Sequence, residues 1–403
     1  MTAHTEASTR PAVELRDVDI VFGDERAAAL AMIDQGRSRQ EILDATGAVL
    51  GAAGVSLTIE TGEICVLMGL SGSGKSTVLR AVNGLNQVAR GAVLVADGDT
   101  TVDVASCSDE VLRRLRQSRV TMVFQQFALL PWRTVRENVG LGLELKGMAK
   151  AERDAIVDVK LAMVGLDKWA EKYAHELSGG MQQRVGLARA FATDADILLM
   201  DEPFSALDPL IRTKLQDELL LLQKDLKKTI VFVSHDLDEA LKLGNHIAIM
   251  EGGRVVQYGP PEEIILKPAN DYVREFVANV NPLTVLTAYN VMRDMRDLEP
   301  AEDGWVWLDR RQTTRFRLDA GGKVVEMVHE GRPARWIACE EADLPRDPND
   351  HLVFWARTST PLKTLMNAMH QNVAAIAVFD DADRFVGGVG VRDVLQAVVR
   401  KQG

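Results

Sequence analysis

The chain has 403 residues, 46% of them hydrophobic and 26% charged, and its formal net charge at pH 7 is −11. That length allows two or three domains with cores of their own, while the acidic balance argues against a nucleic-acid partner, which needs a positive surface. No apolar run approaches the roughly 18 residues of a membrane span, the N-terminus has no signal-peptide pattern, and the scattered cysteines suit neither a disulfide framework nor a zinc site. We therefore expect a soluble, cytoplasmic protein.

The N-terminal part predicts strands around a helical insertion. Residues Val13–Phe22 alternate in polarity like a strand. Residues 26–53 then read as two short helices, the second of which begins with a capping box at Ser38. Strands follow at Val55–Ile59 and Ile64–Met68, on either side of a turn.

Strand-like and helical runs alternate through the middle of the chain. This alternation predicts a mostly parallel sheet between helices. In chain order the runs are a strand at Val120–Phe124, a helix at Glu152–Val164, a strand at Ile197–Met200, a helix over 211–226, a strand at Thr229–Val233 and a closing hairpin over 247–258.

A glycine-rich segment after Ile64–Met68 fits the pattern G-x-x-x-x-G-K-S and leads into a helix-compatible run. Strand, glycine loop and helix together predict a phosphate-binding loop rather than a flexible turn, because backbone N–H groups at a helix N-terminus cradle phosphate oxygens. Lys75 would reach the β- and γ-phosphates of a nucleoside triphosphate, and Ser76 would help to hold Mg²⁺. The predicted nucleotide-binding residues are Gly69, Leu70, Ser71, Gly72, Ser73, Gly74, Lys75, Ser76 and Thr77.

Two carboxylates, Asp201 and Glu202, follow the apolar strand at Ile197–Met200. They would lie at the C-terminal end of that strand, where α/β sheets bind ligands. Asp201 suits a role near Mg²⁺, and Glu202 suits the polarisation of a water for attack on the γ-phosphate. On its own the pair would be read as an exposed acidic strand end, but the preceding phosphate loop favours the functional reading.

A third motif, Ser178-Gly179-Gly180-Met181-Gln182, lies between the loop and the acidic pair and resembles the signature sequence of the ABC ATPases. Other family elements match in order: Gln125 resembles the Q-loop glutamine, and His235 the switch histidine. The resemblance implies an α/β, ABC-type P-loop ATPase cassette that works as a homodimer with ATP and Mg²⁺.

Site roles follow from the same resemblance. Each ATP site would combine the phosphate loop of one subunit with the signature of the other, and an aromatic in the first strand would stack on adenine. The implied residues are Lys75, Gln125, Glu202 and His235 for catalysis; Ser76, Gln125 and Asp201 for the metal; Ser178, Gly179, Gly180 and Gln182 for the signature; Ser205 and Asp208 for the D-loop; and Phe22 for adenine.

The insertion at 26–53, together with Met68–Gly74 and Ala206–Arg212, resembles the quaternary-amine branch of bacterial importers, and other segments look closest to choline-uptake ATPases. This implies the ATP-hydrolysing subunit of an importer of choline or a related quaternary amine, peripheral at the cytoplasmic face of the inner membrane. A permease, contacted by residues 127–136, and a substrate-binding protein would be its partners. The alternatives are a glycine betaine/proline betaine importer ATPase and a soluble, non-transport ABC ATPase.

The character of the chain changes near residue 282, so we expect an ATPase domain over 1–281 and a second domain over 282–403. The end of the chain predicts a helix at Thr360–His370, strands at Ala374–Phe379 and Phe385–Val391, and a helix at Arg392–Lys401. This order resembles a CBS repeat, with a degenerate first copy before it. The resemblance implies an α+β regulatory domain, and a dimer-stabilising appendage is the alternative.

Overall fold

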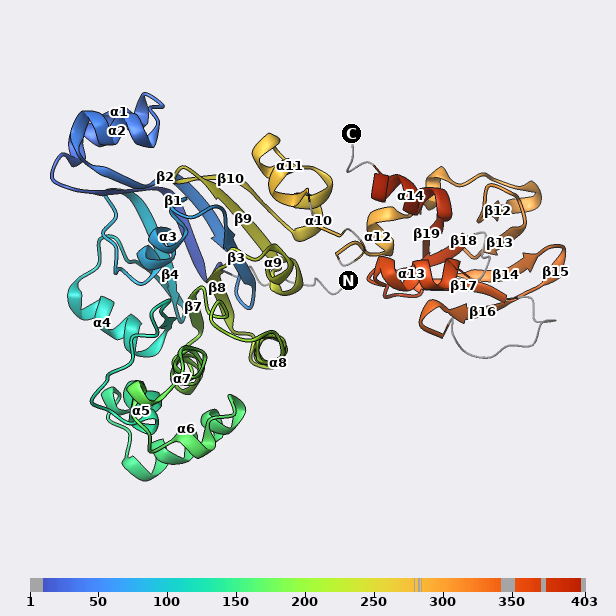
Figure 1. The fold of residues 1–403 in the computed structure, drawn as a ribbon. Helices are drawn as coiled ribbons and strands as arrows, with labels where there is room; N and C mark the ends of the chain where they lie inside the picture. The colour runs from blue at the N-terminus through green and yellow to red at the C-terminus, as the bar shows by residue number, and fades with distance from the viewer. Residues whose placement is uncertain are drawn as a thin grey trace. The chain divides into compact units, whose positions relative to one another are not determined.

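The computed structural model describes residues 10–278, 280–281, 283, 285–341, 352–370 and 375–399. These residues fall into two compact units (Figure 1). The first runs to Ile264 and adds Ala269–Val273, and the second joins Ile265–Pro268 to the chain from Arg274 onward. Pro282, at the boundary expected from the sequence, lies outside the described residues, so that boundary stays a prediction.

A six-stranded sheet forms the centre of the first unit. Strands β9, β3, β8, β7 and β6 are mutually parallel, and β10 runs antiparallel to β9. Every residue of β3, β7 and β8 is buried, as expected of strands covered on both faces. The parallel sheet and the closing hairpin are therefore confirmed. Across the sheet the order is β10 (Arg254–Gly259), β9 (His246–Glu251), β3 (Ile64–Met68), β8 (Thr229–Val233), β7 (Ile197–Asp201) and β6 (Val120–Val123).

A second, antiparallel sheet lies beside the first in the same unit. Its order is β2 (Val49–Ile59), β1 (Val13–Phe22), β4 (Arg90–Asp97) and β5 (Thr100–Asp103). Helix α3 (Lys75–Val82) packs against strands of both sheets, and one hydrophobic core joins them. The phosphate-loop helix is thus fixed between two layers.

The insertion contains the two predicted helices, α1 (Arg26–Asp34) and α2 (Arg39–Thr46). The capping box at Ser38 is present, and Gly47 ends α2 in the left-handed conformation. Residues 49–53 were expected from the sequence to belong to the helical insertion. They instead form the start of β2, because they pair with the last residues of β1, from Phe22 back to Ile20. Figure 1 shows both helices together beyond the edge of the β1–β2 sheet.

Helices flank the parallel sheet. Helices α5, α6 and α7 pack on one another and form a separate lobe in Figure 1, away from α1 and α2. Further helices of this unit are α4 (Asp109–Ser118), α5 (Val135–Leu145), α6 (Lys150–Met163), α7 (Gly179–Ala192), α8 (Pro209–Leu226) and α9 (Leu237–Leu243). Helices α10 (Pro261–Leu266) and α11 (Asp271–Val277) are each divided between the two units.

The second unit contains two sheets. One has the order β11 (Arg293–Asp294), β19 (Phe385–Gly390), β18 (Ala375–Phe379), β17 (Leu352–Arg357) and β16 (Arg335–Ala338), and it packs with α12 (Ala288–Val291), α13 (Leu362–Met369) and α14 (Val391–Val399). The other, which the sequence reading did not predict, is antiparallel: β12 (Trp305–Trp307), β13 (Thr314–Leu318), β14 (Val324–His329) and β15 (Arg332–Pro333).

The predicted helix–strand–strand–helix order at the chain's end is confirmed as α13, β18, β19 and α14. Residues 371–374 and 400–403, which include Ala374 and Lys401 of the predicted elements, lie outside the described residues. The likeness of this unit to CBS repeats stays a prediction.

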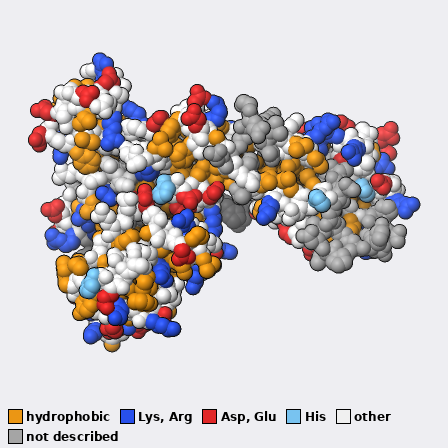
Figure 2. Space-filling model, viewed as in Figure 1, with side chains coloured by type: hydrophobic (Ala, Val, Ile, Leu, Met, Phe, Trp, Pro, Cys, Tyr) orange, Lys and Arg blue, Asp and Glu red, His pale blue; other side chains and the backbone are white. Residues whose placement is uncertain are grey.

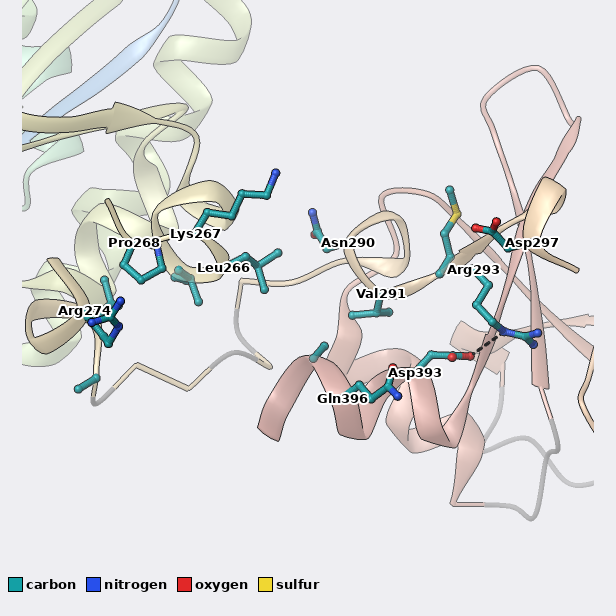
Figure 3. Close-up of a pocket in the computed structure, with 15 residues that line it drawn as sticks. Leu266, Lys267, Pro268, Arg274, Asn290, Val291, Arg293, Asp297, Asp393 and Gln396 are labelled. Atoms are coloured by element: carbon teal, nitrogen blue, oxygen red, sulfur yellow. Dashed lines mark hydrogen bonds and ion pairs between the residues drawn. The ribbon is translucent and has the colours of Figure 1, made fainter. Parts of the chain in front are cut away.

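An ion pair links the start of the second unit to its last helix. Arg293 Nε lies 3.1 Å from Asp393 Oδ2 (Figure 3), and Arg293 also donates to the carbonyl of Leu308. The buried Asp393 accepts from the backbone N–H of Gly390. The beginning of α14 is therefore held by the distant Arg293 and by Gly390, which directly precedes the helix.

Figure 2 shows Lys and Arg side chains interspersed with Asp and Glu over the face of the first unit in view. None of the helices that the structure describes is long and apolar enough to cross a membrane.

Cys65 and Cys339 are buried, and burial raises the pKa of both thiols, that of Cys339 to about 12. Cys107 is half-exposed.

Candidate functional site

The glycine loop connects β3 to α3 in a conformation that other residues adopt poorly. Gly69, Gly72 and Gly74 have φ values of 140°, 78° and 103°, in the left-handed region that favours glycine. A Cβ on Gly69 would overlap the carbonyl oxygen of Met250, and one on Gly74 would overlap that of Gly51. Glycine is thus required here both by the backbone angles and by the close approach of other chain segments.

Lys75 lies over this loop. Its Nζ donates to the carbonyl oxygens of Gly69 and Leu70, each at 2.9 Å. The side chain is buried, and burial lowers the pKa of its ammonium, while the charges of Glu202 and Asp201 act in the opposite direction. A buried ammonium at a glycine loop that leads into a helix fits the predicted contact with a polyphosphate.

Ser76 and Asp201 come together at the end of β7. The Ser76 hydroxyl donates to Asp201 Oδ1 at 2.7 Å, and Arg80 Nη2 lies 2.8 Å from Asp201 Oδ2. Asp201 is completely buried. A hydroxyl and a carboxylate in contact are hard oxygen donors of the kind that Mg²⁺ takes together with water and substrate phosphates, so these residues fit the predicted ion.

Glu202 lies close to two of the other predicted catalytic residues, Gln125 and His235. Its Oε2 lies 3.2 Å from Gln125 Nε2 and 3.6 Å from His235 Nδ1. Its φ of 50° is unusual for a residue with a side chain. The structure therefore brings Gln125, Glu202 and His235, from three different strand ends, to one point beside the phosphate loop.

The loop that carries His235 rests on a buried acid. Ser234 Oγ donates to Glu239 Oε2 at 2.5 Å, and Gln216 Nε2 donates to Glu239 Oε1 at 3.0 Å. Burial raises the pKa of Glu239. The neighbouring Asp236 caps α9, so both ends of this short loop are fixed.

The signature residues form the N-terminus of α7. Ser178 caps the helix by accepting from the backbone N–H of Met181, and Gly179 and Gly180 are its first residues. Gln182 donates to the carbonyls of Ala174 and Leu177, which secures the chain before the helix. Among the described residues, the hydrogen bonds of Ser178 and Gln182 stay near this helix start, and none reaches the phosphate loop of the same chain.

The D-loop residues connect to Glu202 and to α8. Ser205 Oγ donates to the carbonyl of Glu202 at 3.1 Å. Asp208 caps α8 by accepting from the backbone N–H of Ile211. The segment therefore bridges the acidic pair and the following helix.

Phe22, the predicted adenine partner, ends β1 and is 39% exposed. A Cβ built on Gly51 would lie 2.8 Å from both the Phe22 ring and the Thr77 methyl group. Phe22 is thus close to the phosphate-loop helix despite the intervening insertion, because β2 returns alongside β1. Stacking on adenine stays a prediction.

Residues 127–136, predicted to contact a permease, include an unusual turn. Phe127 and Ala128 both have positive φ, and the half-buried Arg189 donates to both of their carbonyls at 2.7 Å. Trp132 in this segment is 70% exposed, and Leu130 is half-buried. The permease contact stays a prediction.

Besides Arg80 on Asp201, the sequence reading missed two residues that contact the predicted site. Arg39, the first residue of α2, donates to the carbonyl of Gly72, so the insertion contacts the phosphate loop. Gln183 on α7 donates to the carbonyl of Glu202. The capping box locates Arg39 at a helix start but gives no sign of its distant contact, and no local pattern marks Gln183.

Comparisons with known proteins agree with this geometry. The ABC transporter family matches residues 52–205. The glycine betaine/proline betaine transport system ATP-binding protein ProV of Salmonella typhimurium is 44% identical, over 97% of this chain and 98% of that protein. The glycine betaine/carnitine transport ATP-binding protein GbuA of Listeria monocytogenes is 42% identical, over 92% and 93%. The dimeric post-hydrolysis structure of the ATP-binding cassette MJ0796, bound to ADP and Pi, is 31% identical with a TM-score of 0.54, over 62% of this chain and 98% of that one.

Proposed function

The chain belongs to the ATP-binding proteins of ABC transporters, and from that premise we propose that it hydrolyses ATP to drive the import of glycine betaine or proline betaine. The observation that carries the proposal is the similarity to ProV over almost the whole of both chains. GbuA, similar over nearly as much of the chain, is named for glycine betaine and carnitine. These relatives favour the betaine alternative of the sequence prediction over choline.

The chemistry assigned to this chain's own residues follows from their positions. Lys75 and the N–H groups of the loop bind the phosphates. Glu202 accepts the proton of the attacking water, with Gln125 and His235 holding that water and the γ-phosphate beside it. Mg²⁺, held through Ser76, Gln125 and Asp201, would neutralise charge on the phosphates when bound.

A homodimer completes the proposed site. The helix N-terminus at Ser178, Gly179 and Gly180 offers N–H groups to the γ-phosphate bound by a second copy. The dimeric state of MJ0796 with ADP and Pi supports this arrangement. A permease and a substrate-binding protein would supply the pore and the amine site, and place this subunit at the cytoplasmic membrane face.

The second unit is assigned a regulatory role. Its separate cores and its division from the first unit support this, because all the predicted catalytic residues lie in the first unit. The alternative is an appendage that only stabilises the dimer.

Uptake measurements test the proposal and separate its alternatives. Host cells that lack this gene would be complemented with the wild type or with Lys75→Ala, and the uptake of labelled glycine betaine, proline betaine and choline compared. We expect betaine uptake to be restored by the wild type alone. Restoration of choline uptake alone would return the assignment to choline. If the uptake of none of these amines depends on the gene, the soluble, non-transport ATPase is favoured.

A further inference from the structure

The main chain of Glu202 is held on both sides in a conformation that it would not adopt unaided. Its φ of 50° lies in the left-handed region, which costs a residue with a side chain about 1–2 kcal/mol and persists only where neighbours enforce it. The N–H of Glu202 donates to the carbonyl of Val233 at 3.1 Å. Its carbonyl accepts from Gln183 Nε2 and Ser205 Oγ, each at 3.1 Å.

Gln183 uses both ends of its amide in this region. It lies on α7 and is only 1% exposed. While its Nε2 donates to Glu202, its Oε1 accepts from the backbone N–H of Ala206 at 3.1 Å. A buried amide that satisfies a carbonyl and an N–H on one loop fixes that loop in position.

The start of α7 also packs directly on this loop. A Cβ on Gly180 would lie 3.0 Å from the carbonyl oxygen of Ala206. Helix and loop are therefore in close contact one turn before Gln183. Any rotation of the helix changes the bonds that Gln183 makes.

We propose that Gln183 is a positioning residue for ATP hydrolysis, which ties the strained Glu202 peptide and the Ser205–Asp208 loop to the signature helix. It is buried and acts through the main chain of Glu202. Because the same helix begins with the signature that serves the second copy's ATP, the orientation of α7 sets the direction of the Glu202 carboxylate in its own site. The inference rests on the proposed function and names a residue that the family motifs used above do not include.

Replacing Gln183 with leucine removes both hydrogen bonds at nearly constant volume. The Ala206 N–H is left unsatisfied, and Glu202 is free to relax toward negative φ. Since a displacement of about 1 Å at a reacting group lowers turnover by about 10²-fold, we expect the turnover of full-length Gln183→Leu to fall by roughly 10- to 100-fold. The affinity for ATP should stay within about threefold, because the loop N–H groups and Lys75 are unchanged.

Gln183→Glu provides a readout that a loss of packing would not give. A protonated carboxyl donates and accepts like the amide, whereas a carboxylate cannot donate to the Glu202 carbonyl. The turnover of this variant relative to the wild type should therefore rise as the pH is lowered. The matched control is Gln223, on α8, which donates to the carbonyl of Gly62 far from these residues: Gln223→Leu and Gln223→Glu should show normal turnover and no such relative rise.

Three measurements on all four variants test whether Gln183 has this positioning role. They are steady-state ATPase assays over a pH series, equilibrium ATP binding and thermal unfolding. Lost turnover with retained ATP affinity, recovered at low pH only in Gln183→Glu, would support the role. Turnover of both Gln183 variants within threefold of the wild type, or a parallel loss of ATP affinity, would overturn it. If Gln183→Leu fails to fold, the pH profile of Gln183→Glu decides alone. A wild type without ATPase activity would instead refute the proposed function.

Discussion

Replacing Gly74 with alanine isolates the geometric requirement of the phosphate loop. Gly74 has a φ of 103°, and a Cβ there would overlap the carbonyl oxygen of Gly51 in β2. The left-handed backbone alone costs alanine about 1–2 kcal/mol. Because the overlapping atom is backbone, the loop or β2 must also shift, and bond-angle strain of this kind adds up to about 4 kcal/mol. Together these two costs reach at most about 6 kcal/mol, most of which the loop avoids by leaving its binding conformation.

Gly147 provides the matched control, because its φ is 77° and nothing lies within 4 Å of an added Cβ. Gly147→Ala should lose only about 1–2 kcal/mol of unfolding free energy and bind ATP normally. Gly74→Ala should bind ATP at least about 100-fold more weakly, since 1.4 kcal/mol corresponds to tenfold. Calorimetric ATP titration and urea unfolding measure both quantities. Equal ATP affinities of the two variants would refute the argument that the approach of Gly51 shapes the loop.

Further predictions concern charge and domain structure. Lys75→Met should abolish ATP binding yet raise the unfolding free energy without nucleotide, because it removes a buried ammonium. Glu202→Gln should bind ATP but turn over about 10²-fold or more slowly, as ATPase assays would report. The raised pKa of Glu239 means that wild-type stability falls as pH rises above the usual range of a glutamate, and Glu239→Gln should flatten that dependence in denaturant melts. Ending the chain after residue 281 should keep basal ATPase activity within about tenfold but change its response to ionic strength.

The sequence predicted those parts of the site that short local patterns encode. The glycine loop and the pair Asp201 and Glu202 each adjoin an apolar strand, so spacing and polarity alone place them at one sheet edge. The meeting of Gln125 with Glu202 was expected only through the family resemblance. In contacts such as Arg39 with Gly72 and Gln183 with Glu202, a side chain of one element donates to a main-chain carbonyl of another. Such contacts leave no periodic pattern in the sequence.

Two strand regions escaped sequence analysis for different reasons. The start of β2 consists largely of alanine and glycine, residues depleted in strands, and pairing with β1 overrides that preference. The β13–β14 hairpin did carry a signal: Thr314–Leu318 alternates in polarity before a turn with Gly321 and Gly322, a pattern typical of hairpins. The sheet of β12 to β15 was therefore predictable in part.

The different burial of the three thiols gives the protein a selective chemical handle. Burial keeps Cys65 and Cys339 protonated and out of reach of reagents at neutral pH. Cys107, half-exposed just before the capping residue of α4, is left as the thiol for maleimide labelling. A fluorophore placed there would sit in the nucleotide-binding unit without any substitution in the chain. Wild-type protein could thus serve directly in fluorescence measurements of how two copies associate.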